Sequence, residues 1–224
     1  MPIDIKPITY FLRDHMLYMD LLVFLVAVWA YKNFDRRLFL LFVNVIVGIL
    51  VVIISDYTRR LGNNIYMSYL FGPYEAIIFS AILFPHKSKP KLRRWVVIGV
   101  CIILISNLLE GFLLTNGFSR YNSITYCLIN GLLGSLAIYQ LLKLRYNPMI
   151  ESLHKTPLFW VSLGIGVHSI GLFVVWAFMR LAQDTSMELL WHLAFIREAI
   201  IYLTLILWII GFYITKKYGP HQDI

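Results

Sequence analysis

Charged residues are scarce in this chain. Asp, Glu, Lys and Arg make up 14% of its 224 residues, whereas hydrophobic residues make up 59% and aromatic residues 16%. This composition lies far outside the range of ordinary soluble domains. The segments between the apolar runs are too short to form a separate soluble catalytic or DNA-binding domain. The sequence therefore predicts an integral membrane protein whose chemistry lies within its helices or short loops.

The chain also has few cysteines. Cys101 and Cys127 are the two cysteines of the chain, and both lie inside apolar runs without a CxxC motif or a Cys/His spacing. This pattern excludes a disulfide framework and a cysteine-based zinc site. It is typical of small residues that pack in a core.

Seven apolar segments are long enough to cross a bilayer as helices, for which about 17 to 25 residues are needed. We predict spans at residues 15–31, 38–55, 65–84, 95–114, 123–142, 158–179 and 189–214. Pro73 is expected to kink the third span, because proline lacks a backbone donor and crowds the preceding turn. The predicted fold is all-α, a polytopic seven-transmembrane-helix bundle that forms a single domain over residues 1–224.

Lysine is absent from all seven predicted spans. A retinal cofactor bound as a Schiff base needs a lysine amine in the last helix, so a photoreceptor of that kind is not expected. The sequence leaves any other cofactor unknown.

Basic residues are divided unequally between the two ends of the predicted bundle. Six Lys and Arg residues lie on the side of the N-terminus, thirteen lie on the opposite side, and Arg197 lies within a span. Because Lys and Arg concentrate in cytoplasmic loops, we expect the N-terminus outside and the C-terminus in the cytoplasm. The most basic loop, at residues 85–94, is expected to contact anionic membrane lipids or a cytoplasmic partner. The sequence has no basic stripe with interleaved exposed aromatic residues outside the spans. Nucleic acid is therefore not expected as a partner.

The last predicted span carries Arg197 and Glu198 well inside its outer half. Each ionisable group costs at least about 2.5–3.5 kcal/mol at such a depth, so these groups usually face a bundle interior with partners. Counting about 1.5 Å per residue from the span ends places further polar residues in the outer half or at mid-depth. We predict that these residues join Arg197 and Glu198 in one polar pocket: Asp20, Glu75, Glu110, Asn130, His168 and His192.

Arg197 is the candidate group for binding an anion, because its planar guanidinium suits a carboxylate or a phosphate. Glu75 and Glu110 are expected to hold Arg197 when the site is empty. The alternative is that the buried polar groups only pair with one another and fasten the helices together. The sequence leaves both interpretations open.

Other classes of function leave weaker signals. A metal-dependent membrane hydrolase acting on a lipid is one alternative, in which His168, Glu75 and Glu198 hold a metal or act as acid and base. No HExxH or paired-histidine pattern supports it, so a metal site stays unknown. A transporter would favour interrupted helices in both halves of the chain. A structural or scaffold subunit of a membrane complex is the remaining alternative.

Several segments carry a resemblance to a known group. They read PLFWVSLGIGVHSIGLF at residues 157–173, ELLWHLAFIREAIIYLTLILW at 188–208, NNIYMSYLFGPYEAIIFSAILF at 63–84 and SRYNSITYCLINGLLGSLAIYQLL at 119–142. Together they resemble uncharacterised seven-helix membrane proteins of Bacteroidetes, some of which are similar to the membrane-embedded input modules of sensor histidine kinases. His168 stands where that group more usually has an aromatic residue, and the Arg197-Glu198 pair is an addition to its pattern.

The resemblance implies signal transduction in a bacterial inner (plasma) membrane and points to Glu75, His168 and His192 as pocket positions. The chain ends in KKYGPHQDI shortly after the last predicted span, so signalling is expected to depend on a separate cytoplasmic partner. We therefore predict a membrane-embedded sensor or receptor-like protein that binds a small molecule or lipid in its outer half.

Overall fold

The computed structural model describes residues 5–60, 65–84, 90–114, 120–150 and 152–219. Within these ranges the protein is helical and contains no strand. The α-helices are α1 (Lys6–Asp14), α2 (Met16–Ala30), α3 (Arg36–Arg60), α4 (Tyr66–Leu83), α5 (Pro90–Leu109), α6 (Ser123–Arg145), α7 (Pro157–Thr185) and α8 (Met187–Tyr218). Short 3₁₀ turns, η1 (Tyr31–Asn33) and η3 (Leu153–Lys155), precede α3 and α7, and a π-helical turn, η2 (Glu110–Leu114), ends α5.

Five of the described helices are long and apolar enough to cross a membrane. They are α3 over Arg36–Thr58, α5 with η2 over Pro90–Leu114, α6, α7 and α8. This finding supports an integral membrane protein with an all-α fold. Helix α2 has 15 residues, fewer than a spanning helix usually needs, and α4 has 18 residues, near the lower end of the usual range.

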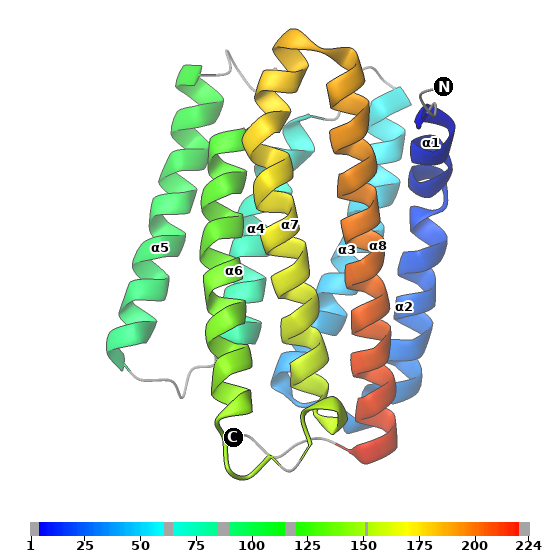
Figure 1. Cartoon of the computed structure of the whole chain (residues 1–224), viewed down its shortest axis with the longest axis vertical. Coiled ribbons are helices and arrows are strands. Elements are labelled where there is room, and N and C mark those ends of the chain that lie inside the picture. The colour runs from blue at the N-terminus through cyan, green and yellow to red at the C-terminus, as the bar shows by residue number, and fades with distance from the viewer. Residues whose placement is uncertain (1–4, 61–64, 85–89, 115–119, 151, 220–224) are drawn as a thin grey trace.

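The helices run up and down in an antiparallel bundle (Figure 1). Helix α7 packs most extensively, against α6 on one side and α8 on the other, and contacts of α8 with α2, α2 with α3, α3 with α4, and α4 with α6 close a ring. Helix α5 packs against α4 and α6, and α1 packs against α8. We call the end where α1 lies and α8 begins the N-terminal end, and the end where α8 stops the C-terminal end.

Most predicted spans are shorter than the helices that contain them. The predicted spans 158–179 and 189–214 leave a connection that we expected to turn at residues 182–188, but α7 continues through Thr185 and only Ser186 separates it from α8. The Ser186 Oγ accepts a hydrogen bond from the Leu189 backbone N–H at 3.2 Å, which caps the start of α8. Pro73 lies inside α4, and the helix continues on both sides of it.

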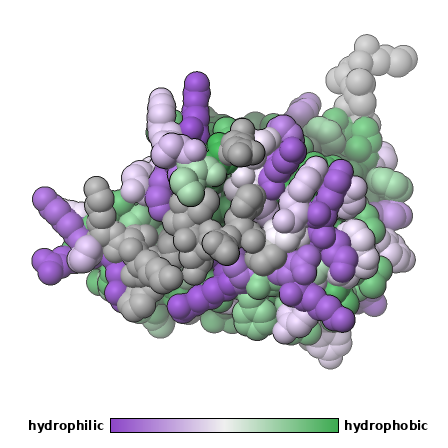
Figure 2. Space-filling model, turned by 90° about the horizontal axis from the view of Figure 1, so that it is seen from below, coloured by the Kyte–Doolittle hydropathy of each residue, from purple (hydrophilic) through white to green (hydrophobic). Residues whose placement is uncertain are grey.

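Hydrophilic side chains gather on the C-terminal end of the bundle (Figure 2). Its described basic residues come from the helix ends and connections there: Lys32, Arg36, Arg37, Lys91, Arg93, Arg94, Lys143, Arg145, Lys155, Lys216 and Lys217. Residues 85–89 of the most basic loop and residues 220–224 of the C-terminal tail lie outside the described residues. The basic excess predicted for this end is thus a property of the helix ends themselves.

Two glycines of α7 let α8 approach closely. A Cβ atom on Gly164 would lie 2.7 Å from Nε1 of Trp208, and one on Gly171 would lie 2.6 Å from Cδ1 of Ile200. Small residues at such positions allow helices in a membrane to pack by van der Waals contact along their length. The contact between α7 and α8 brings the polar residues of the two helices together.

We predict that Gly164→Ala destabilises the bundle by about 1–3 kcal/mol, because the added methyl group overlaps the rigid indole of Trp208. Thermal unfolding in detergent measures the effect. Gly48→Ala is the matched control, since a Cβ there meets nothing within 4 Å. Equal melting temperatures of the two variants would contradict the close packing of α7 on α8.

Candidate functional site

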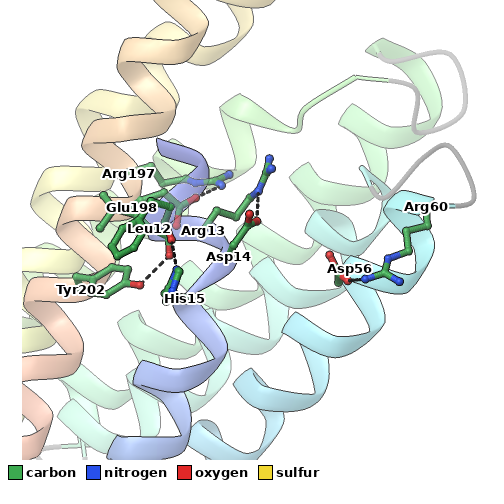
Figure 3. A network of polar contacts seen from close by, with 10 residues as sticks. Leu12, Arg13, Asp14, His15, Asp56, Arg60, Arg197, Glu198 and Tyr202 are labelled. Atoms are coloured by element: carbon green, nitrogen blue, oxygen red, sulfur yellow. Dashed lines mark hydrogen bonds and ion pairs between the residues drawn. The ribbon is translucent and has the colours of Figure 1, made fainter. Parts of the chain in front are cut away.

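Arg197 and Glu198 form an ion pair on α8, in which Nη2 of Arg197 donates to Oε1 of Glu198 (Figure 3). The Glu198 side chain is 4% exposed and that of Arg197 is 29% exposed. The prediction that Glu75 or Glu110 holds Arg197 is wrong. The Glu198 carboxylate is adjacent in sequence and reaches the guanidinium without crossing the bundle. Glu75 instead lies near His168, and Glu110 accepts hydrogen bonds from the start of α6.

Glu110 anchors the start of α6. Its two carboxylate oxygens accept hydrogen bonds from the backbone N–H groups of Ile124 at 3.1 Å and Thr125 at 2.8 Å. These N–H groups lie in the first turn of the helix, where no intrahelical acceptor is available and the helix dipole favours negative charge. Glu110 therefore fastens the π-helical end of α5 to α6 rather than lining a pocket.

Asparagines extend this attachment. Nδ2 of Asn107 donates to the carbonyl of Tyr69 at 2.9 Å, and Nδ2 of Asn122 donates to Oδ1 of Asn107 at 2.9 Å. Nδ2 of Asn130 donates to the Tyr126 carbonyl within α6 at 2.8 Å. For Glu110 and Asn130 the structural interpretation therefore agrees with the contacts.

Glu75 and His168 meet in the centre of the bundle. Oε1 of Glu75 on α4 lies 3.7 Å from Nε2 of His168 on α7, and both residues are buried. The other ring nitrogen of His168, Nδ1, has no hydrogen-bond partner in the described part of the chain. These two predicted pocket residues are therefore brought together from helices that are distant in sequence.

Tyr126 lies between α4 and α7 beside this pair. A Cβ atom on Gly72, one turn before Glu75 on α4, would lie 3.0 Å from Cζ of Tyr126, and the Tyr126 ring stacks on Trp176 of α7. On α2 and α8, Asp20 and Glu198 are both buried.

We call five predicted residues that are buried or half-buried inside the bundle the polar layer: Asp20, Glu75, His168, Arg197 and Glu198. They come from α2, α4, α7 and α8.

Helix α1 lies beside the polar layer, as Figure 3 shows. The Tyr202 hydroxyl donates to the Leu12 carbonyl at 2.7 Å, which ties α1 to α8 one turn below Glu198. The ring of Tyr10 also packs against that of Trp191, with centroids 5.0 Å apart. The short N-terminal helix thus covers the side of α8 that carries the ion pair.

His192 does not join the polar layer. It is exposed, and its Nδ1 lies 2.8 Å from the carbonyl of Glu188 on the same helix. Five residues separate His192 from Arg197, which corresponds to about 140° around a helix axis. The prediction placed the two side chains at a similar depth but did not account for this rotation.

Three aromatic residues near Arg197 were not predicted as site residues. The Tyr126 ring stacks on Trp176 with centroids 4.2 Å apart, and Tyr121 meets Trp176 edge-on at 5.8 Å. The contacts of Gly171 with Ile200 and of Gly164 with Trp208 place Trp176 on α7 level with Arg197 on α8. A depth count could have found Trp176, because it lies nine residues before the end of α7 and Arg197 lies ten after the start of α8.

Aromatic rings close the bundle on the C-terminal side of Glu75 and His168. The Phe79 ring contacts His168 edge-on at 6.1 Å and Trp208 edge-on at 5.8 Å, and Phe212 stacks on Phe34 at 5.3 Å. We call Phe79, Trp208, Phe212 and Phe34 the aromatic plug.

Metal ligands do not gather within the described residues. No group of three or more His, Cys, Asp or Glu side chains there lies close enough to hold a metal ion. Glu75 and His168 form a pair, while Glu198 pairs with Arg197. The three residues proposed for a metal-dependent hydrolase therefore do not assemble as metal ligands.

Comparison with known proteins gives no match to any family model, any curated protein or any solved structure.

We predict that Glu110→Leu lowers the free energy of unfolding by several kcal/mol, since each backbone N–H bound to a charged group contributes about 1.5–3 kcal/mol. Thermal unfolding in detergent is the measurement. Glu188→Leu is the control, because Glu188 is exposed in the first turn of α8. A Glu110→Leu protein that melts with the control would show that the carboxylate does not anchor α6.

Proposed function

We propose that the protein is a membrane-embedded, receptor-like sensor. It binds a small molecule or lipid in the polar layer and signals to a separate cytoplasmic partner. In this proposal seven helices cross a bacterial inner membrane, the N-terminal end faces outward and the basic C-terminal end faces the cytoplasm. The observation that carries the proposal is a buried polar layer with unpaired donors that stops at the aromatic plug.

Unpaired donor groups favour a ligand over a purely structural role. Nε of Arg197, Nδ1 of His168 and Nε1 of Trp176 are buried and have no hydrogen-bond partner among the described residues. A buried polar group without a partner costs about 1–3 kcal/mol. Glu110, Asn107 and Asn122 have their partners within the fold, although other buried groups, among them Nε1 of Trp208, also lack one. A bound molecule would supply the missing partners.

The aromatic plug favours a sensor over a channel or transporter. Phe79, Trp208 and Phe212 are buried between the polar layer and the C-terminal end. A continuous path for a solute would need polar groups or water through this region. A site that is closed on one side suits recognition rather than passage.

The plug also offers a packed route for a signal. Phe79 contacts His168 at one end, and Phe212 stacks on Phe34 at the other. Beside Phe34, Nδ2 of Asn33 lies within hydrogen-bond distance of the Thr215 and Lys216 carbonyls at 3.3 and 3.4 Å. A displacement of His168 would therefore pass through Phe79 to Trp208, and along one turn of α8 to Phe212, the turn η1 and the end of α8.

The C-terminal end fits an acidic partner or anionic lipid. Figure 2 shows hydrophilic side chains at several places on this end, among hydrophobic ones. Lys216 lies over the Trp29 ring at 5.5 Å, and Lys155 over the Tyr218 ring at 5.8 Å. Charge complementarity of this kind speeds encounter with a partner of opposite charge.

We expect native mass spectrometry of gently extracted protein to detect a bound organic mass, because the unpaired donors need partners. Arg197→Leu should lose this mass and remain folded, as judged by gel filtration and thermal unfolding. Glu188→Gln, which changes an exposed carboxylate on the same helix, should retain it. Wild-type protein free of any bound mass, or equal retention by Arg197→Leu, would contradict the sensor proposal.

We further expect Phe79→Ala to uncouple the two ends of the bundle. Hydrogen exchange of residues 31–35 and 213–219 should differ between wild-type and Arg197→Leu protein, and Phe79→Ala should abolish the difference because the contact with His168 is lost. Phe71→Ala on the same helix is the control, since Phe71 stacks on Tyr74 outside the plug. An unchanged difference in Phe79→Ala would contradict this route.

A further inference from the structure

Hydrogen-bond donors concentrate around Arg197. A Cβ atom on Gly171 of α7 would meet Ile200 of α8, and one on Gly164 would meet Trp208, so the antiparallel register of the two helices places Trp176 level with Arg197. Both tyrosine rings contact Trp176, Tyr121 edge-on and Tyr126 stacked. We call Arg197, Tyr121, Tyr126 and Trp176 the donor cluster: Tyr121 precedes α6, Tyr126 lies near the start of α6, Trp176 lies in the last third of α7 and Arg197 in the first third of α8.

Two of these donors are buried and unpaired. Trp176 is 5% exposed, and its Nε1 has no partner in the described residues, as is also the case for Nε of Arg197. The Tyr126 hydroxyl already donates to the Ser68 carbonyl at 3.3 Å. An indole N–H and a guanidinium N–H can only donate. The cluster therefore lacks an acceptor, and its aromatic rings provide an apolar wall beside the unpaired donors.

The charge balance of the site limits the acceptor. Glu198 already neutralises Arg197, so any anion brings charge that no further cation of the donor cluster compensates. A phosphate monoester would bring close to two charges, and each uncompensated charge is costly at this depth. A carboxylate brings one charge and two oxygens that accept several hydrogen bonds.

We propose, on the basis of the sensor function above, that the donor cluster binds the carboxylate of a monoanionic organic acid. Its oxygens accept hydrogen bonds from Nε of Arg197 and Nε1 of Trp176. Its apolar body lies against the rings of Tyr121 and Tyr126. The acid comes either from the membrane, as a fatty acid, or from the outer aqueous phase, as a small soluble carboxylic acid.

Binding of radiolabelled palmitate and benzoate to the full-length, delipidated protein in nanodiscs tests the proposal and separates the two sources. One of the two acids is expected to bind saturably. Its uncharged counterpart, hexadecanol or benzyl alcohol, is expected not to compete. Inorganic phosphate and phosphatidic acid serve as probes of the alternative anion.

Trp176→Phe keeps a ring that can stack on Tyr126 but removes the donor. We expect it to weaken binding of the acid about 10-fold or more, since a hydrogen bond to a charged group is lost. Trp208→Phe is the matched control, because Trp208 is also buried with an unpaired Nε1 but lies in the aromatic plug. Arg197→Lys retains the charge without the planar fork and should also weaken binding at least about 10-fold.

The outcomes separate the proposal from the function on which it rests. Binding of neither acid, equal competition by the alcohols, or equal affinities of Trp176→Phe and Trp208→Phe would each overturn the carboxylate proposal. Arg197-dependent binding of phosphate or phosphatidic acid in place of an acid would overturn it while leaving the sensor function intact. Absence of any retained organic mass in the native protein would instead remove the sensor function.

Discussion

The ion pair of Arg197 and Glu198 is the interaction that the surrounding helices of this bundle have to enclose. Two charges deep in a long apolar helix are tolerated only where the surrounding helices shield them from lipid. Helix α1 covers them on one side, where Tyr202 holds the Leu12 carbonyl. Trp176 of α7 lies level with Arg197 in the register of the two helices, and Tyr126 of α6 stacks on it. The close contact of α7 with α8 at Gly164 and Gly171 then completes this enclosure.

Polar residues serve two physical purposes in this protein. Glu110, Asn107 and Asn122 bind backbone groups or one another across α4, α5 and α6, so their hydrogen-bonding capacity is used within the fold. His168 and Arg197 each keep an unpaired buried nitrogen. The residue types do not separate these purposes, because a buried glutamate or asparagine can do either. Only the contacts separate them.

Hydropathy was sufficient to predict an all-α membrane protein, and depth counting brought Glu75 and His168 into one pocket. The turn predicted at residues 182–188 was wrong because polar residues also extend a helix beyond the apolar region, as α7 does through Thr185. His192 was misplaced because depth was counted without the rotation around the helix axis. Residue type gave no signal for Tyr121 or Trp176, since aromatic residues make up 16% of the chain, and Trp176 could have been found only by its depth. The partner of Arg197 depends on side-chain reach, which spacing alone does not give.

The aromatic plug has a consequence for the response of the protein to membrane voltage. An electric potential falls mainly across the region of low dielectric constant, and the plug is the apolar part of the bundle axis. In the proposed orientation, the polar layer lies on the outer side of this drop. An anion that reaches Arg197 from outside would then cross only a small fraction of the field. Its affinity would depend little on whether the cell is energised, so the sensor would report concentration rather than voltage.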